Sequence, residues 1–129
     1  MKTLAAILVQ TKNPLVLDEI EIPKLRKGQI LVKIHYSGIC GTQLNEIDGK
    51  KGEDQWLPHC LGHEAVGTVC DTGPGVSKIK VDENVVLTWL RGEGIDAGGV
   101  QYGWRKSVVN AGPVTTFQQY AVVSESRVF

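Results

Sequence analysis

The chain lacks a long hydrophobic run, an excess of charge of either sign and an even set of cysteines. No apolar stretch approaches the roughly 20 residues that a membrane-spanning helix requires, so we expect no membrane partner. Lys plus Arg and Asp plus Glu number 14 each among 129 residues, and without a basic stripe we expect no nucleic-acid partner. Three cysteines do not make a disulfide framework, which predicts a reducing, cytoplasmic location.

The rest of the composition is typical of a globular protein, with 42% hydrophobic and 22% charged residues. A chain of this length suits one domain with a core of its own, and it contains no internal repeat or linker. The apolar residues 4–9 are too few for a signal peptide and are not followed by a small-residue cleavage site. We interpret them as part of a first strand.

Short apolar segments bounded by turn residues recur along the chain and predict a mainly β fold, either a small barrel or a sandwich. In the segment 29–37, which has the clearest alternation, Ile30, Val32, Ile34 and Tyr36 would share one face. The predicted strands cover residues 4–10, 15–22, 29–37, 64–71, 85–90 and 116–123, and another strand would start at residue 127.

Two segments interrupt this pattern. Thr42 is a suitable N-cap for a short helix over residues 43–47, which Asp48-Gly49 would end. Residues 91–112 are rich in glycine without a clear period, so we expect a long loop there. Within it, residues 92–97 have the spacing of a dinucleotide-binding fingerprint, but no helix is expected to follow them and no βαβ unit surrounds them. We therefore interpret them as a flexible loop.

Cys40 and His63 are the residues that most directly suggest chemistry, because thiolate and imidazole are ligands that zinc prefers. Glycines flank both residues and permit a close approach of the backbone. Thr42 could direct its hydroxyl into the same space, and Glu64 offers a further ligand or a partner for His63. Spacing alone does not separate this metal site from the alternative that both residues are structural.

Several ordered segments match the pattern of one family: Gly38-Ile39-Cys40-Gly41-Thr42, Leu57-Pro58-His59-Cys60-Leu61-Gly62-His63-Glu64, the first strand with its Lys and Ala, Pro23 to Gly28 with Val32-Lys33, and Phe117-Gln118-Gln119-Tyr120. Together they resemble the zinc-containing medium-chain alcohol dehydrogenases, and the resemblance covers almost the whole chain.

The resemblance implies that residues 1–129 form a GroES-like catalytic domain, a partly open β-barrel with short helices. It implies that Cys40 and His63 are ligands of a catalytic zinc, that the Glu64 carboxylate can approach or replace a ligand, and that the Thr42 hydroxyl passes on the substrate proton. Zinc would polarise the oxygen of a small alcohol or carbonyl substrate, and hydride would be exchanged with NAD or NADP. The full-length protein would be a homo-oligomer.

The sequence also departs from this family. Gln43 stands where an Asp commonly holds the zinc-bound imidazole, and Asn45 stands where some members have a relay His. Residues 91–112 contain no cysteine, so we expect no structural zinc and a more mobile loop. The Rossmann domain, with the cofactor site, and a third zinc ligand are expected outside this sequence. The alternative interpretation is a non-catalytic GroES-like binding or assembly module with a vestigial metal site.

Four further residues carry weaker expectations. We expect Cys60 and Cys70 to be buried packing residues. His59 is close enough to His63 in the sequence to line the same cleft, and Trp56 would form either a pocket wall or part of the core.

Overall fold

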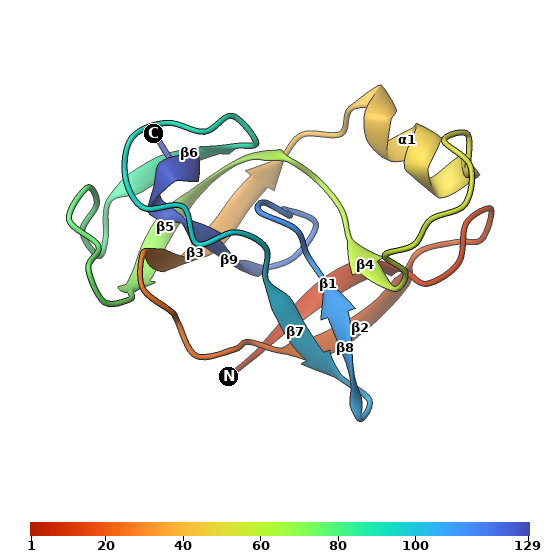
Figure 1. The fold of residues 1–129 in the computed structure, drawn as a ribbon, viewed down its shortest axis with the longest axis horizontal. Coiled ribbons are helices and arrows are strands. Elements are labelled where there is room, and N and C mark those ends of the chain that lie inside the picture. Colours follow the sequence, from red (N-terminus) through yellow and green to blue (C-terminus); the bar gives the residue numbers. More distant parts are fainter.

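The computed structural model describes residues 1–129 and arranges nine strands in two sheets (Figure 1). A closed barrel has the strand order β1–β2–β7–β8–β4, and a four-stranded sheet has the order β6–β5–β3–β9. This arrangement confirms the mainly β fold with a barrel. The elements are β1 (Lys2–Leu8), β2 (Val16–Glu21), β3 (Gln29–Ser37), α1 (Gly41–Asp48), β4 (His59–Cys60), β5 (Glu64–Thr72), β6 (Asn84–Thr88), β7 (Gln101–Trp104), β8 (Ser107–Asn110), β9 (Tyr120–Ser124) and the 3-10 helix η1 (Glu125–Arg127).

Each sheet has its own hydrophobic core. The barrel encloses Ile7, Ile20 and Tyr102, and the second sheet covers Val69 and Leu87. All five are essentially inaccessible to solvent, and burying an aliphatic side chain of this size contributes about 1.5–3 kcal/mol to stability.

Strand β3 is central to the second sheet, because it pairs antiparallel with both β5 and β9. Its pairing with β5 shifts register between Leu31 and Val32 and again between Ile34 and Tyr36. The second shift interrupts the predicted alternation. Tyr36 is 78% exposed, whereas Val32 is fully buried.

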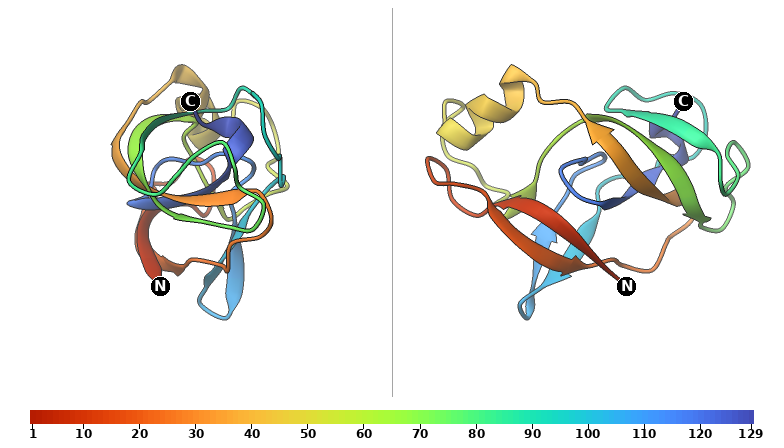
Figure 2. Two further views of the ribbon diagram at one scale, coloured as in Figure 1. Left: turned by 90° about the vertical axis from the view of Figure 1, so that its left-hand side faces the viewer. Right: turned by 180° about the vertical axis from the view of Figure 1, so that it is seen from behind.

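The helix α1 follows β3 and lies at the end of the molecule that also carries β4 (Figure 2). It begins at Gly41 with Cys40 as its N-cap, so the prediction that Thr42 is the cap is wrong. At the other end Gly49 adopts φ +70, the left-handed conformation that commonly ends a helix. Neither α1 nor η1 has the length and apolar character needed to cross a membrane.

The prediction of one long loop over residues 91–112 is also wrong. Strands β7 and β8 form a hairpin whose two turn residues, Arg105 and Lys106, have φ 46 and 69. Two-residue hairpin turns with positive φ usually contain Asn-Gly or a related pair. The hairpin was not predicted because its turn lacks this signal.

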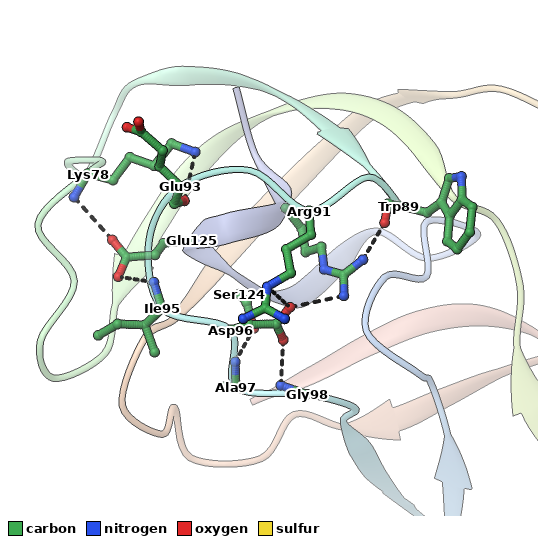
Figure 3. A network of polar contacts seen from close by, with 11 residues as sticks. Lys78, Trp89, Arg91, Glu93, Ile95, Asp96, Ala97, Gly98, Ser124 and Glu125 are labelled. Atoms are coloured by element: carbon green, nitrogen blue, oxygen red, sulfur yellow. Dashed lines mark hydrogen bonds and ion pairs between the residues drawn. The ribbon is translucent and has the colours of Figure 1, made fainter.

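Residues 91–98 precede the hairpin and are fastened to the end of β9 and to η1 (Figure 3). Asp96 forms ion pairs with Arg127 at 3.0 Å and with Arg91 at 3.4 Å. Glu125 accepts a hydrogen bond from the Ile95 N–H at 3.0 Å. These contacts hold the segment without any cysteine.

Candidate active site

A cleft of about 1310 Å³ runs between α1, the chain on both sides of β4 and residues 110–115. Cys40, Thr42, Gln43 and His63 all line it. Cys40 and Thr42 come from the start of α1, whereas His63 comes from the short connection between β4 and β5. The fold therefore brings three of the predicted site residues to one cleft from two separate segments.

The Cys40 thiol is half-buried at the N-cap of α1. Its Sγ lies 3.5 Å from the Thr42 Oγ1. Hydrogen bonds from the side chain and backbone of Thr42 lower the pKa of Cys40, against the opposing effects of burial and of the Glu64 charge. A lowered pKa favours the thiolate, which is the form that binds metals.

Gln43 connects the two sides of the site. Its side-chain oxygen accepts a hydrogen bond from the Cys40 N–H at 2.7 Å, and its amide nitrogen lies 2.9 Å from the Nδ1 of His63. Gln43 is only 2% exposed, so these two contacts provide the hydrogen-bond partners of a buried amide group. The sequence identified Gln43 as a departure from the family but did not show that it contacts both predicted zinc ligands.

Glu64 does not line this cleft, although its charge acts on the Cys40 thiol. It is exposed at the start of β5 and is absent from the cleft lining, and its carboxylate lies beside Gly38. No three His, Cys, Asp or Glu side chains of residues 1–129 are grouped to hold a metal ion. Cys40 and His63 are of the residue types that bind a catalytic zinc, and residues 1–129 do not group a third such side chain with them.

Residues 26–129 match the family model of the alcohol dehydrogenase GroES-like domain. The chain belongs to the medium-chain zinc alcohol dehydrogenase family. The match covers most of the chain, including the two segments that carry Cys40 and His63, and it agrees with the barrel and second sheet of the structure.

Several alcohol dehydrogenases are similar in sequence to part of this GroES-like domain. An alcohol dehydrogenase of Geobacillus stearothermophilus is 41% identical over 86 residues, which make up 67% of this chain and 26% of the relative. An alcohol dehydrogenase class-3 of Dictyostelium discoideum is 38% identical over 86 residues, 67% of this chain and 22% of the relative. The domain therefore spans about a quarter of the length of these relatives.

Solved structures show the same fold. The benzyl alcohol dehydrogenase of Acinetobacter calcoaceticus superposes with a TM-score of 0.79 at 23% identity, over 99% of this domain and 40% of that chain. An alcohol dehydrogenase zinc-binding domain protein of Burkholderia ambifaria superposes with a TM-score of 0.75 at 23% identity, over 100% of this domain and 41% of that chain.

The cleft of the GroES-like domain also contains a partly buried histidine–aspartate contact that the sequence did not indicate. The Nε2 of His59 lies 2.6 Å from the Oδ2 of Asp54, and its Nδ1 lies 2.9 Å from the Cys60 carbonyl oxygen. Burial opposes ionisation of Asp54, but hydrogen bonds from His59 and from the Trp56 N–H outweigh it and lower the pKa of Asp54. The pair ties the loop after α1 to β4.

Asp54→Asn is expected to lower the free energy of unfolding of the domain by about 1–3 kcal/mol at neutral pH, because it removes a charge-assisted hydrogen bond. The folded-state pKa of Asp54 lies below its ordinary value of 3.8, so its contribution is present above that value and is lost as the pH falls through the folded-state pKa. Urea unfolding at neutral pH and at a pH of about 3 measures both effects. An equal difference between variant and wild type at the two pH values would contradict this account.

The remaining predictions have mixed outcomes. Cys60 is 3% exposed, as predicted, and burial raises the pKa of its thiol to about 12. Cys70 is exposed, so the prediction that it is buried is wrong. Trp56 is 69% exposed and lines the cleft, so it forms a wall and is not part of the core. Arg127 also lines the cleft, although nothing in the sequence predicted this.

Proposed function

We propose that this domain is the N-terminal catalytic part of a zinc-dependent alcohol dehydrogenase, which exchanges hydride between a small alcohol and its carbonyl product with NAD or NADP. One observation carries the proposal: Cys40, Thr42 and His63 come from two segments of the chain and line one cleft. The relatives named alcohol dehydrogenase support the same reaction class.

In this proposal Cys40 and His63 hold the zinc ion, which when bound supplies a Lewis acid that polarises the substrate oxygen. The Thr42 hydroxyl, close to the Cys40 sulfur, receives and passes on the proton of the alcohol. Glu64, which does not line the cleft, would be the carboxylate that can approach or replace a ligand of the zinc. The exposed side of Trp56 lies against the substrate.

The remaining parts of the active site belong to this proposal as well. The relatives are about four times as long as the stretch they share with this domain. We propose that the nicotinamide site, the third zinc ligand and the contacts of a homo-oligomer lie in the part of a full-length protein that corresponds to the remaining three quarters of these relatives. Residues 1–129 by themselves should therefore bind zinc weakly and transfer no hydride.

Cobalt(II), which replaces zinc and absorbs light when bound by a thiolate, tests the proposed ligands. Titrated in excess into the 129-residue chain, it should produce a thiolate-to-metal absorption band whose growth fits one weak site per chain. Cys40→Ser should abolish the band, because the sulfur ligand is lost, and His63→Asn should weaken metal binding by a factor of about 10 or more.

Cys70→Ser is the matched control, since it removes an exposed thiol on the outer side of β5 and should leave the band unchanged. Loss of the band with Cys70→Ser, or a band that survives Cys40→Ser, would refute the ligand assignment. A full-length protein that is folded and contains no zinc would favour the non-catalytic binding module.

A further inference from the structure

We infer that Gln43 holds the metal-free His63 as the Nε2–H tautomer and so opposes metal binding at this histidine. The inference rests on the proposed function, in which His63 is a zinc ligand. It concerns a residue of this chain that touches both proposed ligands while being itself almost fully buried.

The orientation of the Gln43 amide follows from the backbone. The Cys40 N–H can only donate, so the Gln43 atom that lies 2.7 Å from it must be the acceptor, Oε1. The amide nitrogen therefore faces His63, at 2.9 Å from Nδ1. An amide NH₂ can only donate, so Nδ1 must accept and carry no proton. In the neutral ring the proton then resides on Nε2.

This tautomer is the wrong one for a metal ligand. With Nδ1 occupied by Gln43, Nε2 is the only ring nitrogen left for a metal, and binding requires its lone pair. The proton would have to move to Nδ1, where it would face the NH₂ of Gln43. Exchanging the positions of the Gln43 amide oxygen and nitrogen would provide an acceptor for the His63 Nδ1–H, but it would place the NH₂ against the Cys40 N–H. One donor–donor contact remains in either orientation.

The burial of Gln43 makes this mismatch costly. At 2% exposure the amide has little access to water that could replace the lost partner. A buried donor left without an acceptor costs about 1–3 kcal/mol, which corresponds to a factor of about 5 to 150 in affinity. Metal loading is thus coupled to the loss of one of the two hydrogen bonds of Gln43, either to the Cys40 N–H or to the His63 ring.

A carboxylate of the same length removes the conflict. In Gln43→Glu both side-chain oxygens accept, one from the Cys40 N–H and the other from a His63 Nδ1–H. The variant should therefore favour the Nδ1–H tautomer and leave the Nε2 lone pair free. It should bind metal about 10- to 100-fold more tightly than the wild type.

The tautomer can be measured without any metal. Long-range ¹H–¹⁵N correlation spectra distinguish a protonated ring nitrogen from a bare one, and the chain has only three histidines to assign. At a pH of about 8, above the ordinary histidine pKa, His63 should be protonated at Nε2 in the wild type and at Nδ1 in Gln43→Glu. The Nδ1–H tautomer in the wild type would overturn the inference, whatever the metal titrations show.

The metal titration is the second test, and Gln55→Glu is its control. Gln55 is exposed and lines the same cleft, so this variant adds the same charge without the two hydrogen bonds. Gln43→Glu should bind zinc and cobalt(II) at least about 10-fold more tightly than Gln55→Glu. Equal affinities would overturn the role of Gln43 in metal loading.

The two measurements separate the inference from the proposed function. If no variant binds metal but the wild-type tautomer is Nε2–H, the proposed zinc site fails, and with it the effect of Gln43 on metal loading. The assignment of the tautomer is then still supported by the spectra. If metal binds and the tautomer is the opposite one, the proposed function stands and the inference about Gln43 is refuted.

Discussion

Glu125→Ala is expected to lower the free energy of unfolding by about 3–5 kcal/mol, because it leaves three backbone N–H groups without an acceptor. Glu125 is 1% exposed. Its carboxylate accepts from the N–H groups of Lys78 at 3.1 Å and Ile95 at 3.0 Å (Figure 3). It also accepts from the Ser77 N–H at 3.3 Å. One side chain thus fastens two surface segments to the end of β9.

Urea unfolding followed by tryptophan fluorescence measures this loss, and Glu93→Ala is the matched control. Glu93 is an exposed carboxylate two residues before Ile95, and its removal should change stability by less than about 0.5 kcal/mol. If the two variants lost similar amounts of stability, the hydrogen bonds of Glu125 would not contribute as argued here.

The effect of Glu125→Ala should also depend on pH. Burial opposes ionisation of Glu125, but the N–H groups of Ile95, Lys78 and Ser77 outweigh it and lower the pKa below the ordinary value of 4.5. A carboxylate with a lowered pKa stabilises the fold above its unfolded-state pKa and loses this contribution as the pH falls through the folded-state value. The difference between wild type and Glu125→Ala should therefore be full at neutral pH and shrink below a pH of about 4.5.

Most of the strands could be predicted from the sequence because alternation is a local property. β3 has the predicted bounds, and β5 differs by one residue. The β7–β8 hairpin was not predicted, since Arg105 and Lys106 adopt positive φ without glycine or asparagine. The last predicted strand also differs. Residues 125–127 form η1, and only Val128 makes a bridge, to Leu87 of β6.

The candidate site was predictable only in its residue types. The motifs around Cys40 and His63 indicated the family, and the family model confirms that indication. The partners of the buried polar groups could not be predicted, because neither alternation nor motif spacing shows which side chains meet in the folded chain. The bond between Gln43 and His63 joins α1 to the β4–β5 connection, and Asp54 reaches His59 across a loop.

Gly62→Ala is the other change with a large expected effect, because Gly62 precedes His63 at a crowded turn. Its φ is +92, and a Cβ there would lie 2.2 Å from the Thr116 Oγ1 and 2.7 Å from the Phe117 Cδ1. Positive φ costs a non-glycine residue about 1–2 kcal/mol, and forcing extra atoms into a packed site costs about 1–3 kcal/mol more. The variant should lose about 2–5 kcal/mol of stability in urea unfolding.

Gly52→Ala separates the two contributions. Gly52 has φ +91, almost the same as Gly62, but a Cβ there would meet nothing within 4 Å. It should lose only the cost of the positive φ, about 1–2 kcal/mol. The additional loss of stability in Gly62→Ala then measures the steric cost of the contact with Thr116 and Phe117. This close packing positions the backbone immediately before His63. Equal losses in the two variants would show that the turn yields at little cost and that this contact does not position the histidine.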